Sequence, residues 1–338
     1  MSKVTSPRET VEDGFMVSLR PRTLEEYVGQ EKIKKRLIVA MEAARMRGEP
    51  LDHILLAGPP GLGKTTLAHI IANEMNARIH VTSGPIIERQ GDLAAIVTSL
   101  DFQDVLFIDE VHRLSKVVEE ILYAAMEDFK LDIMIGKGPS ARSIRIDVEP
   151  FTLVAATTRS GLISAPLRNR FGMVFELDFY SEEEIKEIVE RTARKLGIEI
   201  VEEAASYVAQ RSRGTPRIAN RLVKRIRDVA TIKKTNVITL AIARETMKML
   251  EIDDHGLDSV DRKILKVIIE TFNGGPVGIK ALAASMGMEP DTISEVYEPY
   301  LLQAGFIART HRGRVVTEKA WKHMGYSKAV GPLWDEDG

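Results

Sequence analysis

Cysteine is absent from the 338-residue chain, so disulfide bonds, cysteine-ligated zinc sites and thiol nucleophiles are all excluded. The absence suits a reducing compartment, and we expect a cytoplasmic protein. Charge of one sign is also missing, because 47 Lys and Arg are balanced by 49 Asp and Glu. Any surface that binds nucleic acid must therefore be local.

Long hydrophobic runs are missing as well. No apolar run approaches the roughly 20 residues of a membrane span. The first 17 residues are polar and lack the apolar core of a signal peptide. We therefore expect no membrane association. The chain is nevertheless 44% hydrophobic, which is enough for two or three domains with sizeable cores.

The strongest signal is the stretch GPPGLGKTT at residues 58–66. It follows the apolar run Ile54–Ala57 and opens a helical pattern, as the phosphate-binding P-loop requires. Its backbone N–H groups and the helix N-terminus would surround phosphate oxygens. The alternative interpretation is a Gly/Pro turn without a binding function. The expected nucleotide contacts are Gly61, Leu62, Gly63, Lys64, Thr65 and Thr66.

Two carboxylates close the next apolar segment. Residues 105–108 predict a buried parallel strand, and Asp109 and Glu110 follow it. Ligands of open α/β sheets bind at this edge, so both carboxylates are expected beside the P-loop. Asp109 and the Thr65 hydroxyl suit Mg²⁺, whereas Glu110 suits polarising an attacking water.

A third buried strand is predicted over residues 151–159, ending in Thr157 and Thr158. If the three strands are neighbours, either hydroxyl could touch the γ-phosphate or its water. Arg168 and Arg170 lie in the loop that follows. Such arginines are usually solvated, but in an oligomeric P-loop ATPase one can reach the neighbouring subunit's γ-phosphate.

A helical region begins at Ser181, where a capping serine precedes an acidic first turn, and continues to about residue 252. Within it, Thr215 is expected to cap a helix that starts at Pro216. Arg217 in that first turn opposes the helix dipole. We therefore expect it to pair with an anion such as a nucleotide phosphate.

Residues 131–135 and 144–148 predict a β-hairpin around a glycine-containing loop. The consecutive residues Ile133, Met134 and Ile135 place apolar side chains on both faces of one strand, and Ile144 and Ile146 lie on the other. Two interpretations are open. The faces pack on the domain itself, or the arm binds a protein partner.

Beyond a linker at residues 253–256, three predicted helices (258–272, 280–286 and 291–303) precede a hairpin of residues 306–310 and 315–317 with a tight turn at 311–314. This order is the winged form of the helix-turn-helix. The segment thus predicts a domain that commonly binds DNA.

Charge distribution within this segment favours the hairpin, or wing, as the DNA contact. The third helix carries Asp291, Glu295 and Glu298 and no Lys or Arg, so it would repel phosphates. The wing carries Arg309, Arg312 and Arg314. We expect contact with the DNA backbone or minor groove and little base specificity. The alternative is a winged fold used only for protein contacts.

Taken in order, these motifs resemble the RuvB family, the bacterial Holliday-junction branch-migration motors of the AAA+ class. The resemblance covers about residues 15 to 325. It rests on residues 58–65, Asp109-Glu110-Val111-His112-Arg113, the Thr157-Thr158-Arg159 strand end, residues 168–171, Gly214-Thr215-Pro216-Arg217 and the winged helix.

The resemblance implies ATP and Mg²⁺, a homohexameric ring on Holliday-junction and duplex DNA, and work with RuvA, and with RuvC through the junction complex. It implies that the hairpin at residues 131–147 docks on RuvA. The roles that it implies are Thr158 as sensor 1, Arg170 as the arginine finger, Arg217 as sensor 2, Leu19, Arg20 and Tyr180 in the nucleotide pocket, and Arg309 and Arg314 on DNA.

The predicted fold is α/β, with an AAA+ P-loop parallel-sheet domain (1–180), a small helical lid domain (181–253) and a winged-helix domain (254–338). The predicted activity is ATP hydrolysis that drives duplex DNA through a ring. A clamp-loader-type switch would carry Ser-Arg-Cys where Arg168-Asn169-Arg170 stands. A winged-helix regulator that merely binds ATP would not need Glu110 and Arg170. A protein unfoldase is disfavoured because the chain has no protease module or zinc site.

Overall fold

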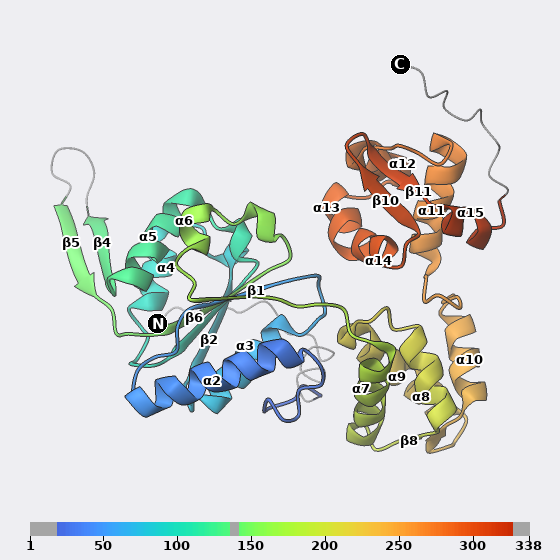
Figure 1. The fold of residues 1–338 in the computed structure, drawn as a ribbon, viewed down its shortest axis with the longest axis horizontal. Coiled ribbons are helices and arrows are strands. Elements are labelled where there is room, and N and C mark those ends of the chain that lie inside the picture. The colour runs from blue at the N-terminus through green and yellow to red at the C-terminus, as the bar shows by residue number, and fades with distance from the viewer. Residues whose placement is uncertain (1–18, 136–141, 327–338) are drawn as a thin grey trace. The chain divides into compact units, whose positions relative to one another are not determined.

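The computed structural model describes residues 19–135 and 142–326, except for the side chains of residues 132–143 (Figure 1). The chain divides into two compact units. One unit runs to Leu196 and includes Gly214–Arg221, and the other comprises Gly197–Arg213 and the residues from Leu222 onward. The predicted lid region is therefore shared between the two units.

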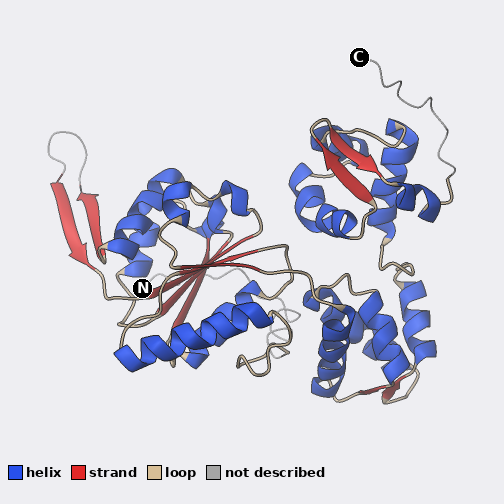
Figure 2. Cartoon of the chain, viewed as in Figure 1, coloured by secondary structure: helices blue, strands red, loops and turns tan. Residues whose placement is uncertain are grey.

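A parallel five-stranded sheet forms the centre of the first unit, in the order β2-β3-β6-β1-β7 (Figure 2). Each strand is short. The central strands β1, β3 and β6 are mainly apolar and are buried almost throughout, as strands covered on both faces must be, whereas the edge strand β2 is only partly buried. The strands are β1 (Ile54–Ala57), β2 (Ile79–Ser83), β3 (Val105–Asp109), β6 (Thr152–Thr157) and β7 (Met173–Glu176).

Helices cover both faces of this sheet. Figure 1 shows α2 (Glu31–Arg47) and α3 (Lys64–Glu74) on one face and α4 (Gln90–Val97), α5 (Lys116–Glu127) and the short α6 (Ala165–Arg168) on the other. Alternate strand residues such as Leu106 and Ile108 join α4 and α5 in one buried cluster. This packing fixes the carboxyl ends of the strands, where the predicted site residues lie.

The predicted hairpin is present as the antiparallel pair β4 (Lys130–Ile135) and β5 (Arg142–Asp147). It projects from the sheet domain (Figure 1). Ile146 packs against the core cluster, whereas Ile144 is 46% exposed. The hairpin base thus packs on the domain. The side chains of Ile133, Met134 and Ile135 lie outside the described residues.

The region from Ser181 to Ile252 is mainly helical, with α7 (Glu182–Lys195), α8 (Glu202–Gln210), α9 (Pro216–Ile232) and α10 (Leu240–Met249). The Ser181 side chain accepts from the Glu184 N–H, and Glu184 accepts in return from the Ser181 N–H. The expectation of helix throughout was wrong. Residues Glu199–Ile200 (β8) pair in parallel with Val237–Ile238 (β9).

The C-terminal segment contains α11 (Ser259–Phe272), α12 (Ile279–Met286) and the wing strands β10 (Ile307–Thr310) and β11 (Gly313–Val316). Phe306, Leu265 and Leu301 are among the buried residues of its separate core. Because β11 begins at Gly313, Arg314 lies in a strand opposite Arg309 and not in the turn. A further helix, α15 (Glu318–His323), was not predicted, although Thr317 caps it through the Ala320 N–H.

The predicted third helix is not continuous. It consists of α13 (Pro290–Thr292), a wider π-helical turn (Ile293–Tyr297) and α14 (Glu298–Gln303). Pro299 has no N–H to donate to the preceding turn, which accounts for the break in regular α-helix. Among all the residues that the structure describes, no helix has both the length and the apolar character needed to cross a membrane.

Candidate functional site

The P-loop connects the buried strand β1 to α3, which begins at Lys64. All three of its glycines have positive φ and leave no room for a side chain, as two of them illustrate. Gly63 has φ +103, and a Cβ there would lie 2.9 Å from the Tyr27 hydroxyl. Gly61 has φ +84, and its Cβ would lie 2.7 Å from the methyl group of Thr215. The loop is therefore enclosed by side chains from before and after it in the sequence.

Lys64 is buried at the end of the loop. Its ammonium donates to the carbonyl oxygens of Gly58 (2.7 Å) and Pro59 (2.8 Å), and the residue is 7% exposed. Burial lowers the pKa of Lys64 to about 8, the Asp109 charge opposes this, and the Arg217 charge adds to it. Asp109 and Arg217 therefore both lie within electrostatic reach of Lys64.

The two carboxylates have different surroundings at the end of β3. Asp109 accepts a hydrogen bond from the Glu110 N–H at 2.8 Å. Glu110 has φ +49, which turns it out of the strand, and its side chain pairs with Arg113 at 3.0 Å. Both partners of that pair are more than one third exposed, so the pair is weak and can open.

The β6 strand end distinguishes its two threonines. Thr157 is fully buried, and its hydroxyl lies 3.0 Å from His112 Nδ1 and accepts from the Arg159 N–H. Thr157 is therefore occupied in tying β6 to the segment after Glu110. The half-buried Thr158 is the better candidate for a nucleotide contact. The role of His112 was not predicted, because nothing in its spacing marks it.

Two tyrosines support the P-loop from outside. The Tyr180 hydroxyl donates to the Leu62 carbonyl at 3.1 Å, and the Tyr27 hydroxyl lies 3.0 Å from the Tyr180 hydroxyl. Burial raises the pKa of Tyr180 to about 12. Sequence reasoning found Tyr180 by resemblance and missed Tyr27, a lone tyrosine in an irregular segment.

Leu19 and Arg20 lie at the start of the described chain. Leu19 is buried, and the carbonyl groups of Leu19 and Arg20 accept from the Lys195 ammonium at 3.5 and 3.3 Å. Burial lowers the pKa of His69, and the Arg20 charge contributes, which places that charge near α3. Arg20 therefore lies near the P-loop helix, and Leu19 lies beside α7.

The segment Gly214–Arg217 packs directly on the P-loop. The Arg217 N–H donates to the Gly61 carbonyl at 3.3 Å, and Gly214 accepts from the Tyr180 N–H at 3.0 Å. This proximity explains why the Arg217 charge acts on the Lys64 pKa. The chain thus brings together the P-loop, Asp109, the β6 end and Arg217, which are far apart in sequence.

Arg170 is held by contacts within the chain. Its guanidinium pairs with Glu127 at 2.8 Å, lies over the Tyr123 ring and donates to the Pro166 carbonyl at 2.9 Å. The Tyr123 hydroxyl is in turn bonded to Ser164, which caps α6. These contacts, which sequence reasoning missed, fix the loop that carries Arg170.

The wing arginines are partly engaged within the domain. Arg309 and Arg314 each make two hydrogen bonds to the carboxylate of Glu298, which is 1% exposed. The expectation that Glu298 repels phosphate was wrong, because that carboxylate is buried and neutralised. Arg312 lies exposed in the turn.

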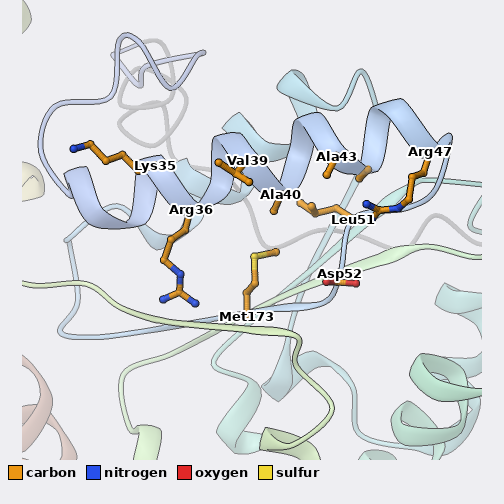
Figure 3. Close-up of a pocket in the computed structure, with 10 residues that line it drawn as sticks. Lys35, Arg36, Val39, Ala40, Ala43, Arg47, Leu51, Asp52 and Met173 are labelled. Atoms are coloured by element: carbon orange, nitrogen blue, oxygen red, sulfur yellow. The ribbon is translucent and has the colours of Figure 1, made fainter.

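The cavity shown in Figure 3 is separate from the P-loop site. It has a volume of about 510 Å³ and lies between α2 and the start of β7, lined by Arg36, Val39, Asp52 and Met173 among others. Met173 and Asp52 stand at the amino ends of strands β7 and β1. The P-loop follows the carboxyl end of β1, so this cavity is not the nucleotide site.

A P-loop at the carboxyl edge of a parallel sheet, two carboxylates beside it and an arginine from a helical lid define a nucleotide-binding protein of the AAA+ class, here with a winged-helix domain. Three family models match the chain: the Holliday junction DNA helicase RuvB P-loop domain (residues 19–177), the RuvB AAA lid domain (180–253) and the RuvB C-terminal winged helix domain (254–325). The chain belongs to the RuvB family, and the predicted fold class is confirmed.

Relatives agree over almost the full length. The Holliday junction branch migration complex subunit RuvB of Kosmotoga olearia is 64% identical, with 98% of each chain covered. The protein of that name from Thermotoga maritima is 65% identical, covering 96% of this chain and 98% of its own. The solved Thermotoga maritima RuvB Holliday junction branch migration motor superposes with a TM-score of 0.85 at 62% identity, covering 92% of this chain and 99% of that one.

Proposed function

We propose that this chain is an ATP-driven motor that moves the branch point of Holliday junctions in recombination and DNA repair. One observation carries the proposal: the lid segment with Arg217 packs on the Gly61 carbonyl of the P-loop, in a chain that ends in a winged helix. A change of nucleotide state at the P-loop then acts directly on the lid segment that carries Arg217.

Hydrolysis proceeds by in-line attack of water on the γ-phosphate, with Glu110 polarising that water. Lys64 and Arg217 hold the phosphates, and the Thr158 hydroxyl orients the γ-phosphate or its water. The Thr65 hydroxyl and the Asp109 carboxylate are hard oxygen donors that fit Mg²⁺. Bound Mg²⁺ supplies positive charge to the phosphate oxygens.

Arg170 acts on the neighbouring subunit. Its loop follows β6 and is braced by Glu127 and Tyr123, so the guanidinium belongs to a fixed surface of its own subunit. A finger in trans raises the rate by on the order of 10³–10⁵. A lone subunit is then almost inactive, and the working form is a closed homohexameric ring.

The wing contacts duplex DNA without base specificity, through Arg309, Arg312 and Arg314. The hairpin of residues 131–147 docks on RuvA through Ile133, Met134, Ile135 and Ile144, whereas Ile146 packs on the domain's own core. RuvC joins through the junction complex. Exposure of Ile144 supports this assignment. The protein works in the cytoplasm.

Branch migration of a synthetic four-way junction tests the proposal. Wild type with ATP, Mg²⁺ and RuvA is expected to separate the junction into duplexes, and Lys64→Ala is expected not to. Lys35→Ala, in the cavity of Figure 3, is the matched control. ATPase stimulated by a sliding clamp and unaffected by junction DNA would instead identify a clamp-loader-type switch.

A further inference from the structure

Arg213 occupies a singular position in the chain. It is the last residue of its segment in the C-terminal unit, and the next residue, Gly214, belongs to the P-loop unit. Arg213 adopts φ +55, a backbone conformation that residues other than glycine seldom adopt, and it is only 8% exposed. A long charged side chain is therefore buried at the start of the segment that leads to Arg217.

The Arg213 side chain is directed to the first helix of the winged-helix domain. Its guanidinium pairs with Asp261 at 2.6 Å and with Asp258 at 3.1 Å. Its Nε donates to the Gly256 carbonyl at 2.7 Å, and the group lies over the Tyr300 ring. Asp258 and Asp261 form the N-terminal capping box of α11, so Arg213 binds the start of that helix.

The predicted linker is also held in place. Asp253 accepts from the N–H groups of His255 and Leu257, both at 2.9 Å. The other Asp253 oxygen lies 2.9 Å from His323 Nε2, and the Tyr300 hydroxyl donates to the His255 carbonyl at 2.6 Å. Residues 253–257, which connect α10 to α11, are therefore held against the winged-helix domain.

A charged cluster of this kind is a poor source of stability. Burying charges carries a large desolvation penalty, and apolar residues of similar volume often serve stability as well or better. Asp261 shows the penalty directly, since it is fully buried and its Oδ1 has no hydrogen-bond partner. What such a cluster provides is one defined geometry.

We propose that Arg213, Asp258 and Asp261 form a coupling clasp that makes the winged-helix domain follow the movement of the Gly214–Arg217 segment. Arg213 is a positioning residue here, because its guanidinium is bound by Asp258, Asp261 and the Gly256 carbonyl and acts through them. The proposal rests on the proposed motor function. In this arrangement, a shift of Arg217 at the nucleotide displaces the Arg213 backbone, and the clasp carries that shift to α11 and the wing.

Coupling is measured as the number of junctions migrated per ATP hydrolysed, with RuvA present. Arg213→Gln and Asp261→Asn are expected to lower this ratio at least tenfold while junction-stimulated ATPase stays within about twofold of wild type. Glu245→Gln is the matched control, because it removes the exposed Lys233 pair of the same unit. Its ratio should not change.

A bridging experiment separates coupling from mere folding. The chain has no cysteine, so in R213C/D261C the two new thiols are the sole targets for a short bifunctional maleimide. The unbridged variant is expected to hydrolyse ATP without migrating junctions, and bridging is expected to restore migration.

The proposal is overturned if the single variants keep the wild-type ratio, if ATPase falls in parallel with migration, or if bridging restores nothing. Failure of the motor function itself is recognised separately. In that case, wild type would not migrate junctions at all.

Discussion

Arg309 and Arg314 are direct cross-strand partners in the wing, and both guanidinium groups bind the same buried carboxylate of Glu298. Two like charges placed opposite each other in a strand pair would otherwise repel. Glu298 accepts hydrogen bonds from both guanidinium groups, and its negative charge offsets their repulsion, so the wing remains a regular hairpin. The pKa of Glu298 is lowered despite burial, because both arginines hydrogen-bond to it.

The three wing arginines should therefore separate into two groups on substitution. Arg312→Ala removes an exposed charge, and it is expected to reduce the slope of log affinity against log salt by about 1 with no change in thermal unfolding. Arg314→Ala is expected to lower the unfolding temperature, because its side chain is only 16% exposed and is bonded to the buried Glu298 carboxylate. DNA binding at several salt concentrations and a thermal melt measure both. An unchanged slope in Arg312→Ala would remove the wing from the phosphate contacts.

Glu110→Gln should separate nucleotide binding from turnover. The amide cannot polarise the attacking water as the carboxylate does, so ATP hydrolysis is expected to fall by about 10²–10⁴ while ATP affinity is retained. Arg113→Ala is the matched control, because it breaks the exposed pair with Glu110 and leaves the carboxylate in place. Loss of ATP binding in Glu110→Gln would contradict the assignment.

Arg170→Ala and Lys64→Ala should complement each other in mixed rings. Each variant alone is expected to lose at least about 10²-fold in ATPase. In a mixture, a subunit with intact Arg170 can serve a neighbour with an intact P-loop, so activity should return in part. Equal mixtures that stay as inactive as the two variants would show that Arg170 acts within its own subunit.

Asp261 should make stability pH-dependent. Burial raises its pKa to about 7, far above the ordinary value, although the Arg213 charge opposes the shift. Between about pH 4 and about pH 7 the folded form thus holds a proton that the unfolded form releases, whereas above this range Asp261 is ionised in both forms. The Asp261 contribution to stability therefore falls as pH rises from about 4 to about 7. Relative to Asp261→Asn, wild type should lose unfolding temperature over this range.

Asp258→Asn should change the pH dependence of stability in the opposite direction. The pKa of Asp258 is lowered, by hydrogen bonds and by the Arg213 charge acting against desolvation. Its stabilising contribution is present above the ordinary pKa of an aspartate and is lost as pH falls further. The two differences from wild type should therefore change in opposite directions as pH changes. Parallel changes would contradict both assignments.

Much of the fold could be predicted because its signals are local. The helix over Glu31–Arg47 ends at Gly48 with φ +69, as a glycine after a helical pattern indicates. The P-loop and the apolar runs of β1 and β3 are equally local. The break at Pro299 was also readable in principle, because proline cannot continue the hydrogen-bond pattern.

Long-range pairing of charges could not be predicted. Glu298 reads as an exposed acid on a helix face, and its burial between Arg309 and Arg314 depends on how the wing folds back. In the same way, Arg213 and Asp261 have no sequence pattern that links them, and Arg170 gives no sign of Glu127. From the sequence alone, charged residues of this kind are expected at the surface. Which of them form buried pairs depends on contacts between distant segments of the folded chain.

The interleaving of the two units has a consequence for synthesis. Residues 197–213 leave the ribosome before Gly214–Arg221, but they belong to the unit that is finished last. The P-loop unit therefore lacks its final segment until Arg221 has emerged, and the earlier segment must wait for the winged helix. Neither unit can be excised as one continuous piece, so we expect a nascent chain stopped after Lys195 to be an incomplete nucleotide-binding body.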